Sequence, residues 1–100
     1  MKTFIRLVGT LTVAATALSA HAYTGQNLAK DAKITITEAR AIALRAHPGK
    51  VTDQELEKEP GGSGLRYSFD IRSGAVTQEV GVDAQTGKVI ENKAEGPHPD

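Results

Sequence analysis

The stretch "LRYSFDIRSGAVTQEVGVD", residues 65–83, decides the fold of this chain. Bulky apolar residues alternate with polar ones in its first half, and valines recur at matching positions in its second half. This period of two residues is typical of strands with one buried face. The alternating apolar residues are Leu65, Tyr67, Phe69, Ile71, Val76, Val80 and Val82. The stretch therefore predicts an antiparallel hairpin with one face in the core.

A tight turn at Ser73 and Gly74 sets the register that we predict for this hairpin. All the apolar residues then lie on one face, and Gln78 is the single polar residue among them. A slip of one residue would destroy this arrangement. The predicted opposite pairs are Leu65 with Val82, Tyr67 with Val80, Phe69 with Gln78 and Ile71 with Val76.

A helix is predicted before the hairpin, in "ITITEARAIALRAHPGK", residues 34–50. Thr35 followed by Glu38 forms a capping box, and Pro48 with Gly49 ends the helix, which we expect to span about Ile36 to His47. Its apolar residues recur at spacings of three and four, so one face should lie on the sheet. They are Ile36, Ala39, Ile42, Ala43 and Ala46.

Another strand is predicted between the helix and the hairpin, at about residues 51–58. Val51 and Leu56 differ in parity, so both cannot face the core without a bulge, and we expect Leu56 to be the buried one. The acidic stripe Asp53, Glu55, Glu57 and Glu59 then shares the outer face with Arg66 and Arg72 of the next strand. Cross-strand ion pairs with these arginines are expected, and binding of a cation or a basic partner is the open alternative.

The stretch "VDAQTGKVIE", residues 82–91, is interpreted as a turn between two strands. An EF-hand needs oxygen ligands at its third and fifth positions, where Gln85 and Gly87 stand, and a P-loop needs a hydroxyl residue after Lys88. A turn needs Asp83 to accept backbone amides and Gly87 to take a positive φ. Both residues are where a turn requires them, so this hairpin should close the sheet.

The N-terminus has the pattern of a signal peptide that is cleaved after Ala22. Lys2 and Arg6 precede the uncharged run 7–18, which is shorter than the roughly 20 residues that cross a bilayer. A retained amphipathic anchor is the alternative. We expect a periplasmic or secreted protein. The predicted organisation is a signal peptide at 1–22, a flexible arm at 23–33, a folded domain at 34–92 and a disordered tail at 93–100.

Charge and cysteine content narrow the possible partners. The sequence has 12 Lys and Arg against 12 Asp and Glu, and loss of Lys2 and Arg6 leaves a small negative excess. This balance argues against nucleic acid and anionic membranes as partners. The chain has no cysteine, which excludes disulfides and thiolate metal sites. We expect no cofactor.

No catalytic constellation is recognisable, and we predict that the protein is not an enzyme. His47 should end the helix, where an imidazolium interacts favourably with the helix dipole. His98 lies in the polar tail, and a weak metal site from His98 and Asp100 is a minor alternative. No histidine is placed to activate Ser63, Ser68 or Ser73. The acidic stripe lacks the burial that would suit a carboxylate to acid–base catalysis. We assign no catalytic, cofactor-binding or metal-binding residue.

The order of these segments resembles the PepSY domain, over about residues 34–92. The resemblance is carried by a Thr-x-x-Glu-Ala helix start, a Pro-Gly helix stop, a Glu-Leu-Glu strand and an Asp-x-x-Thr-Gly-x-Val turn. They stand in "ITITEARAIALRAHPGKV", "ELEKE", "LRYSFDI" and "VGVDAQTGKVIE". The resemblance implies an α+β fold with one helix packed on a small antiparallel sheet of three to four strands, in agreement with the residue patterns.

The resemblance also implies a function. PepSY domains occur in propeptides of thermolysin-type metalloproteases and in small exported bacterial proteins, where they would regulate or inhibit peptidases or assist their folding. We therefore expect a non-catalytic interaction module whose partner is a peptidase or another envelope protein. No protease sequence follows, so inhibition is expected to act in trans. The alternative is a periplasmic protein that binds a small ligand or metal through the acidic stripe or the His98 tail.

Overall fold

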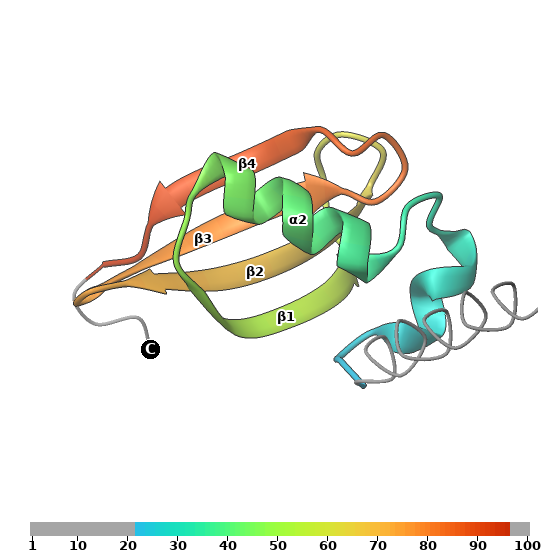
Figure 1. The fold of residues 1–100 in the computed structure, drawn as a ribbon. Coiled ribbons are helices and arrows are strands. Elements are labelled where there is room, and N and C mark those ends of the chain that lie inside the picture. The colour runs from blue at the N-terminus through green and yellow to red at the C-terminus, as the bar shows by residue number, and fades with distance from the viewer. Residues whose placement is uncertain (1–21, 97–100) are drawn as a thin grey trace, which may run out of the picture.

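An antiparallel sheet of four strands, with one α-helix across one of its faces, forms the folded part of the chain (Figure 1). The computed structural model describes residues 22–96. The order of the strands in the sheet is their order in the sequence, and each strand pairs antiparallel with the next. They are β1 (Lys50–Lys58), β2 (Leu65–Ser73), β3 (Val76–Asp83) and β4 (Val89–Ala94). The predicted α+β class is confirmed.

Helix α2 (Ile36–Ala46) begins at the predicted capping box. The Glu38 N–H donates to Thr35 Oγ1 (3.1 Å), and the Thr35 N–H donates to Glu38 Oε1 (2.8 Å). Two N–H groups that the first turn leaves free are thus satisfied. His47 is the C-cap, so the helix ends one residue earlier than expected. Ala39 and Ala43 are fully buried, because their small side chains let α2 approach the sheet closely.

The core lies between α2 and the covered face of the sheet. It is built from the alternating residues of the hairpin together with Leu56, which is 2% exposed. The Tyr67 hydroxyl satisfies its hydrogen-bonding capacity at the edge of this core by donating to Ile34 O (2.9 Å). The predicted buried face is therefore confirmed. Its fully buried large residues are Tyr67, Phe69, Leu56, Ile71, Val80 and Val82.

The predicted register of the central hairpin is wrong by two residues. Tyr67 lies opposite Val82 and Phe69 opposite Val80, and the pair Ser73 and Val76 closes the ladder. The turn consists of Gly74 and Ala75, not of Ser73 and Gly74. Gly74 has a φ of 63°, and no non-glycine residue among 22–96 has a positive φ, so the glycine must occupy the first loop position. A shift of two residues keeps every side chain on its face, which is why the core prediction survives.

Strand β1 contains the bulge that its parity conflict predicts. The pairing with β2 shifts between Val51, opposite Ile71, and Asp53, opposite Asp70. After this irregularity Leu56 lies opposite Tyr67 on the buried face. One extra residue therefore lets both Val51 and Leu56 pack toward the core.

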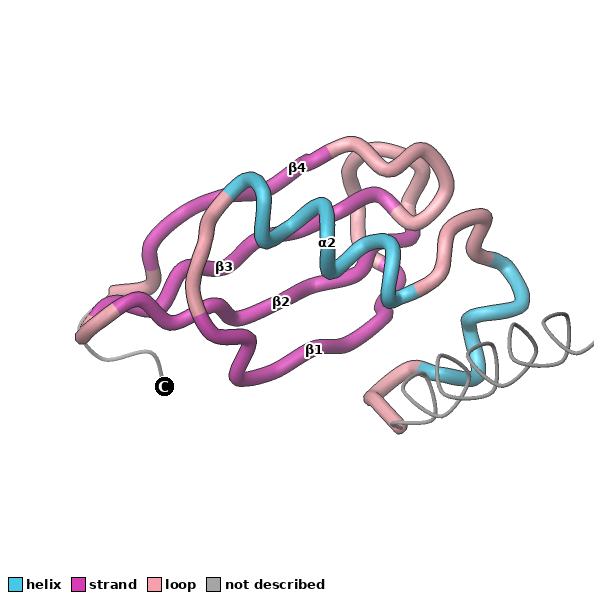
Figure 2. Tube along the Cα trace, in the orientation of Figure 1, coloured by secondary structure: helices cyan, strands magenta, loops and turns pink. Residues whose placement is uncertain are grey.

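The segment before the helix is more structured than a flexible arm. Residues 26–31 form the 3₁₀ helix η1 (Gln26–Asp31), which Figure 2 shows beside the end of the sheet. The apolar side chains of Tyr23 and Leu28 are partly buried and pack against the core, which holds this segment on the domain. At the other end, β4 continues to Ala94, two residues into the predicted tail.

The remaining predictions about the termini concern residues outside the described part. These are the signal peptide, apart from Ala22, and the end of the tail at 97–100. Within residues 22–96 no helix has the length and apolar character needed to cross a bilayer.

Candidate functional site: the Asp83 turn, the outer face and the sheet edges

Asp83 is the most completely buried acid of the described chain and organises one end of the sheet. Its carboxylate accepts hydrogen bonds from two loops. In the β3–β4 turn, the donors are the N–H groups of Gln85 (2.8 Å) and Thr86 (3.1 Å). The carboxylate also accepts the N–H (2.6 Å) and the hydroxyl (2.9 Å) of Ser63 in the β1–β2 loop. The residue is 1% exposed.

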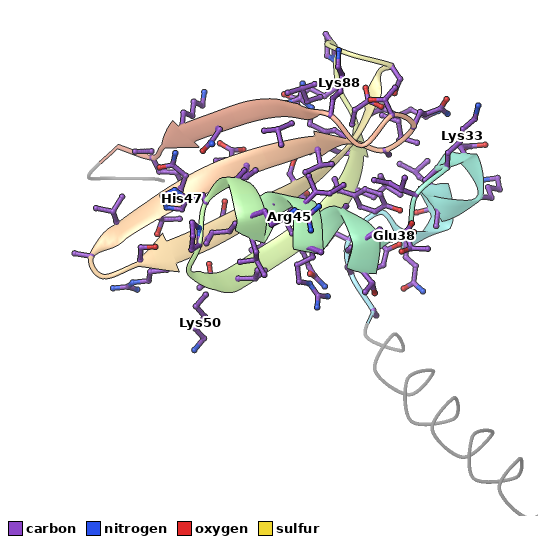
Figure 3. The ribbon with its side chains drawn as sticks, turned by 45° about the horizontal axis from the view of Figure 1, so that its top comes forward. Lys33, Glu38, Arg45, His47, Lys50 and Lys88 are labelled. Atoms are coloured by element: carbon purple, nitrogen blue, oxygen red, sulfur yellow. The ribbon has the colours of Figure 1, made fainter. Side chains whose placement is uncertain are left out.

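These hydrogen bonds decide the ionisation of Asp83. Burial alone would raise its pKa, but the donors from Ser63, Gln85 and Thr86 outweigh burial and lower the pKa to about 2. The carboxylate is therefore charged at neutral pH with its acceptor positions occupied, which suits a structural clamp and not a proton-transfer group. Lys88, the basic residue of the turn, points away from the sheet (Figure 3). The interpretation of this stretch as a turn is confirmed, with Ser63 as a partner that the sequence did not reveal.

Arg66 does not pair with the acidic stripe, contrary to expectation. It lies opposite Glu57 on β1, yet its guanidinium reaches the other way to Glu91 of β4 (2.9 Å) and to Pro60 O (2.9 Å). The path crosses Gly81 of β3, where an added Cβ would lie 3.4 Å from Arg66 Nη1 and 3.2 Å from Glu91 Cβ. Glycine in this strand therefore makes room for an ion pair between β2 and β4.

Arg72 also leaves the stripe unpaired, because its Nε donates to Gly74 O (3.0 Å). Of the acids on β1, Glu57 accepts the hydroxyl of Ser68 (2.7 Å). No ion pair to the acids of β1 is formed within residues 22–96. The acidic stripe thus lies on the outer face without the neutralising partners that the sequence suggested.

Carboxylates from neighbouring strands extend this stripe across the outer face. Asp53, Asp70 and Glu79 lie side by side on β1, β2 and β3. Burial first, then the carboxylate of Glu95 and that of Asp53, raise the pKa of Asp70 to about 6. Burial and neighbouring acids also raise the pKa values of Glu55 and Glu79. The outer face therefore concentrates mutually repelling negative charge.

A groove of about 500 Å³ lies between the arm, α2 and the bulged end of β1. It is lined by residues 22–24, Arg40 and residues 51–54. The Nε of Arg40 donates to Gln54 Oε1 (3.1 Å), which fixes the side chain at the wall of the groove. The groove therefore presents one oriented guanidinium, that of Arg40, and one acid, Asp53.

The serines and histidines named from the sequence are not brought together. Ser63 binds Asp83, Ser68 binds Glu57, and the hydroxyl of Ser73 donates to Pro48 O (2.7 Å). His47 lies at the C-terminal end of α2 (Figure 3), and its Nε2 is buried without a hydrogen-bond partner among the described residues. Within residues 22–96 no three His, Asp or Glu side chains are arranged to hold a metal ion. His98 and Asp100 lie outside the described residues.

The two edges of the sheet differ in how much backbone they leave free. At β1, the Leu56 N–H donates to Thr24 O (2.9 Å), and Thr24 forms a parallel bridge with Glu55. The arm therefore covers part of this edge. At β4, no described residue pairs with the side that faces away from β3.

A scan against protein families matches residues 33–93 to the model described as the peptidase propeptide and YPEB domain, PepSY. The match covers more than half of the sequence. The chain belongs to the PepSY family. Neither the curated proteins nor the solved structures contain a significant match.

Membership of the PepSY family fits the geometry described above. The matched residues begin just before α2 and end within β4, so the match contains the helix and the whole sheet except its last residue. The family is that of peptidase-propeptide-like modules. The open edge, the acidic outer face and the groove are therefore surface features of this PepSY domain.

Proposed function

We propose that the chain is an exported, non-catalytic PepSY module that binds a peptidase or another envelope protein and regulates it. The observation that carries the proposal is the open edge of β4, together with the family's description as a peptidase propeptide domain. An unpaired strand offers a row of backbone donors and acceptors to an extended segment of a partner. The proposal assigns a binding role to this edge and no reaction to any side chain.

Export is part of the proposal and rests on the N-terminal sequence pattern. A signal peptide cleaved after Ala22 would leave Tyr23 as the first residue. Tyr23 packs against the core, and Thr24 binds the β1 edge, so the mature N-terminus would be held on the sheet. N-terminal sequencing of the protein recovered from the cell envelope should therefore begin at Tyr23. A protein that retains residues 1–22, or that stays in the cytoplasm, would contradict export.

Binding is tested by crosslinking in the native envelope, identification of the attached protein, and a peptidase inhibition assay. We expect inhibition or a defined complex at micromolar concentration, weakened by Ala94→Pro, which removes an N–H group from the open edge. Lys58→Ala, an exposed change at the β1 edge, serves as the control. Absence of any partner and of inhibition at micromolar concentration would count against the proposal.

The groove beside Arg40 supports a second candidate function, the binding of a small ligand. Its volume and its oriented guanidinium suit a compact anionic metabolite. Thermal shift measurements against a panel of envelope metabolites and divalent ions test this candidate. A stabilising anion whose effect disappears in Arg40→Ala would support it, and an unchanged melting temperature across the panel would dismiss it.

A further inference from the structure

The open β4 edge has a sequence that complements itself. The polar residue Asn92 is preceded by an acid, Glu91, and followed by a base, Lys93. No residue among 22–96 covers this edge, and Figure 1 shows β4 at the border of the sheet. A strand with this charge order meets opposite charges when an identical strand approaches it in the antiparallel direction.

The backbone groups that face outward on β4 follow from its pairing with β3. The Glu95 N–H donates to Thr77 O (2.9 Å), so Glu95 directs its backbone groups toward β3. Hydrogen-bonded pairs alternate along an antiparallel ladder, so Lys93 and Glu91, opposite Glu79 and Gly81, do the same. Asn92 and Ala94 therefore direct their N–H and C=O groups away from the sheet.

We propose that β4 pairs with β4 of a second copy of this chain, antiparallel about a twofold axis at Asn92. The outward N–H and C=O of Asn92 would then bond to those of Asn92 in the second copy. Glu91 would lie opposite Lys93 of the second copy, and Lys93 opposite its Glu91. The two four-stranded sheets become one continuous sheet, in the isologous arrangement of a twofold dimer.

Electrostatics selects this register over its neighbours. Pairing centred on Glu91 or on Lys93 would put identical charges opposite each other. Pairing centred on Ala94 would leave most of β4, which ends at that residue, without a partner. Centring on Asn92 is the arrangement that joins opposite charges twice and uses the strand from Ile90 to Ala94.

Electrostatics also selects β4 over β1 as the self-pairing edge. The acidic stripe Asp53, Glu55, Glu57 and Glu59 runs along β1 and one residue past its end, so two β1 edges would repel each other. Thr24 of the same chain already occupies part of that edge. On β4, by contrast, the Lys93 side chain is 68% exposed and pairs at the surface with Glu91 Oε2 of its own strand (3.2 Å), a position from which its ammonium group can also approach Glu91 of a second copy. Contact between single strands is small, so the association should be weak and reversible.

Single-cysteine crosslinking tests the register, because the chain has no cysteine of its own. In Asn92→Cys the two introduced residues would face each other as a hydrogen-bonded pair with Cα atoms about 5.5 Å apart, within disulfide range. Under mild oxidation, disulfide dimers should form about tenfold faster than in Lys58→Cys, an exposed control at the β1 edge. Equal rates, or faster crosslinking at residue 58, would overturn the proposal.

Analytical ultracentrifugation of the purified protein tests the charges. Wild type should shift reversibly from monomer to dimer as its concentration rises to about 1 mM, and Lys93→Glu should weaken the dimer about tenfold by facing Glu91 with a second acid. Lys58→Glu makes the same charge change away from β4 and should leave the dimer intact. Circular dichroism checks that each variant is folded. A wild type that stays monomeric, or a folded Lys93→Glu that dimerises as wild type does, would refute the pairing.

This inference goes beyond the proposed regulatory function and does not depend on it. Both crosslinking and sedimentation use the purified chain without any peptidase, so failure to find a partner would leave them unaffected. A dimer of this kind would occupy the edge that a partner needs. Self-association and partner binding would therefore compete for this edge. Lys93→Glu, which weakens the dimer, would free the edge for a partner.

Discussion

At the scale of single residues, the buried carboxylate of Asp83 joins two loops that are far apart in the sequence. Ser63 donates twice to it from the β1–β2 loop, while Gln85 and Thr86 donate from the β3–β4 turn. All these groups are donors, so the site requires an acceptor-only side chain. The charge of Asp83 is thus used to hold one end of the sheet together.

Asp83→Asn should lower the free energy of unfolding by about 2–4 kcal/mol, because the amide NH₂ would face donors in place of an acceptor oxygen. Urea denaturation at neutral pH measures the change. Ser63→Ala, which removes the hydroxyl but keeps the N–H donor, should cost less, about 1 kcal/mol. A variant Asp83→Asn as stable as wild type would show that the two loops do not depend on this carboxylate.

Gly87 provides a second residue-scale prediction. Its φ of 80° is unfavourable for any residue with a Cβ, although a Cβ would find ordinary contact 3.5 Å from Ile42 Cδ1. Gly87→Ala should therefore destabilise by on the order of 1 kcal/mol through backbone strain. Lys88→Ala, at the exposed neighbour, should change stability little and is the control. Loss of partner binding in Lys88→Ala at unchanged stability would return this turn to consideration as a binding site.

Local chemistry was readable from the sequence at this scale, and contacts between loops were not. The roles of Asp83 and Gly87 are predictable because the acceptor and the positive φ that a turn needs lie within a few residues of each other in the sequence. Ser63 was missed because its partner is twenty residues away across the sheet. The ion pair of Arg66 with Glu91 was missed as well, although Gly81 in the middle of a strand was a signal that side chains could cross there.

At the scale of elements, helix limits and strand faces were predictable, and the register was not. Capping residues mark the start of α2 directly. The alternation in β2 and β3 repeats every two residues, so it distinguishes the two faces but cannot distinguish registers that differ by two. Only the turn decides between such registers, and here Gly74, with its positive φ, occupies the first loop position. The bulge in β1 was predictable because Val51 and Leu56 compete for the same face.

The capping box yields a prediction for α2 as an element. Thr35→Ala removes the acceptor of the Glu38 N–H and should lower the free energy of unfolding by about 1 kcal/mol. Thr37→Ala, an exposed change inside the first turn, is the matched control and should have a smaller effect. Thermal and urea unfolding followed by circular dichroism provide the measurement. Equal effects of the two substitutions would mean that tertiary packing, not the cap, fixes the start of α2.

At the scale of the whole molecule, two aspartates give stability opposite dependences on pH. The pKa of Asp83 is lowered to about 2, below the value of about 3.9 in an unfolded chain, so its contribution of about 2 kcal/mol is present above pH 4 and is lost as the pH falls toward 2. The pKa of Asp70 is raised to about 6. The folded state therefore prefers protonated Asp70, and stability falls as the pH rises from about 4 through 6. The two effects together predict greatest stability near pH 4.

Asp70→Asn measures how much the acidic outer face contributes to this pH dependence of stability. The variant removes a charge that lies beside Glu95 and Asp53, so at pH 7 it should exceed wild type in stability by about 1 kcal/mol, and at pH 4 the two should be nearly equal. The slope of stability between pH 4 and 6 should flatten in the variant. Asp31→Asn, an exposed change on η1, should keep the slope of wild type. A variant Asp70→Asn that is less stable than wild type at pH 7 would mean that its carboxylate makes a favourable contact, and the outer face would not be the site of unrelieved repulsion described above.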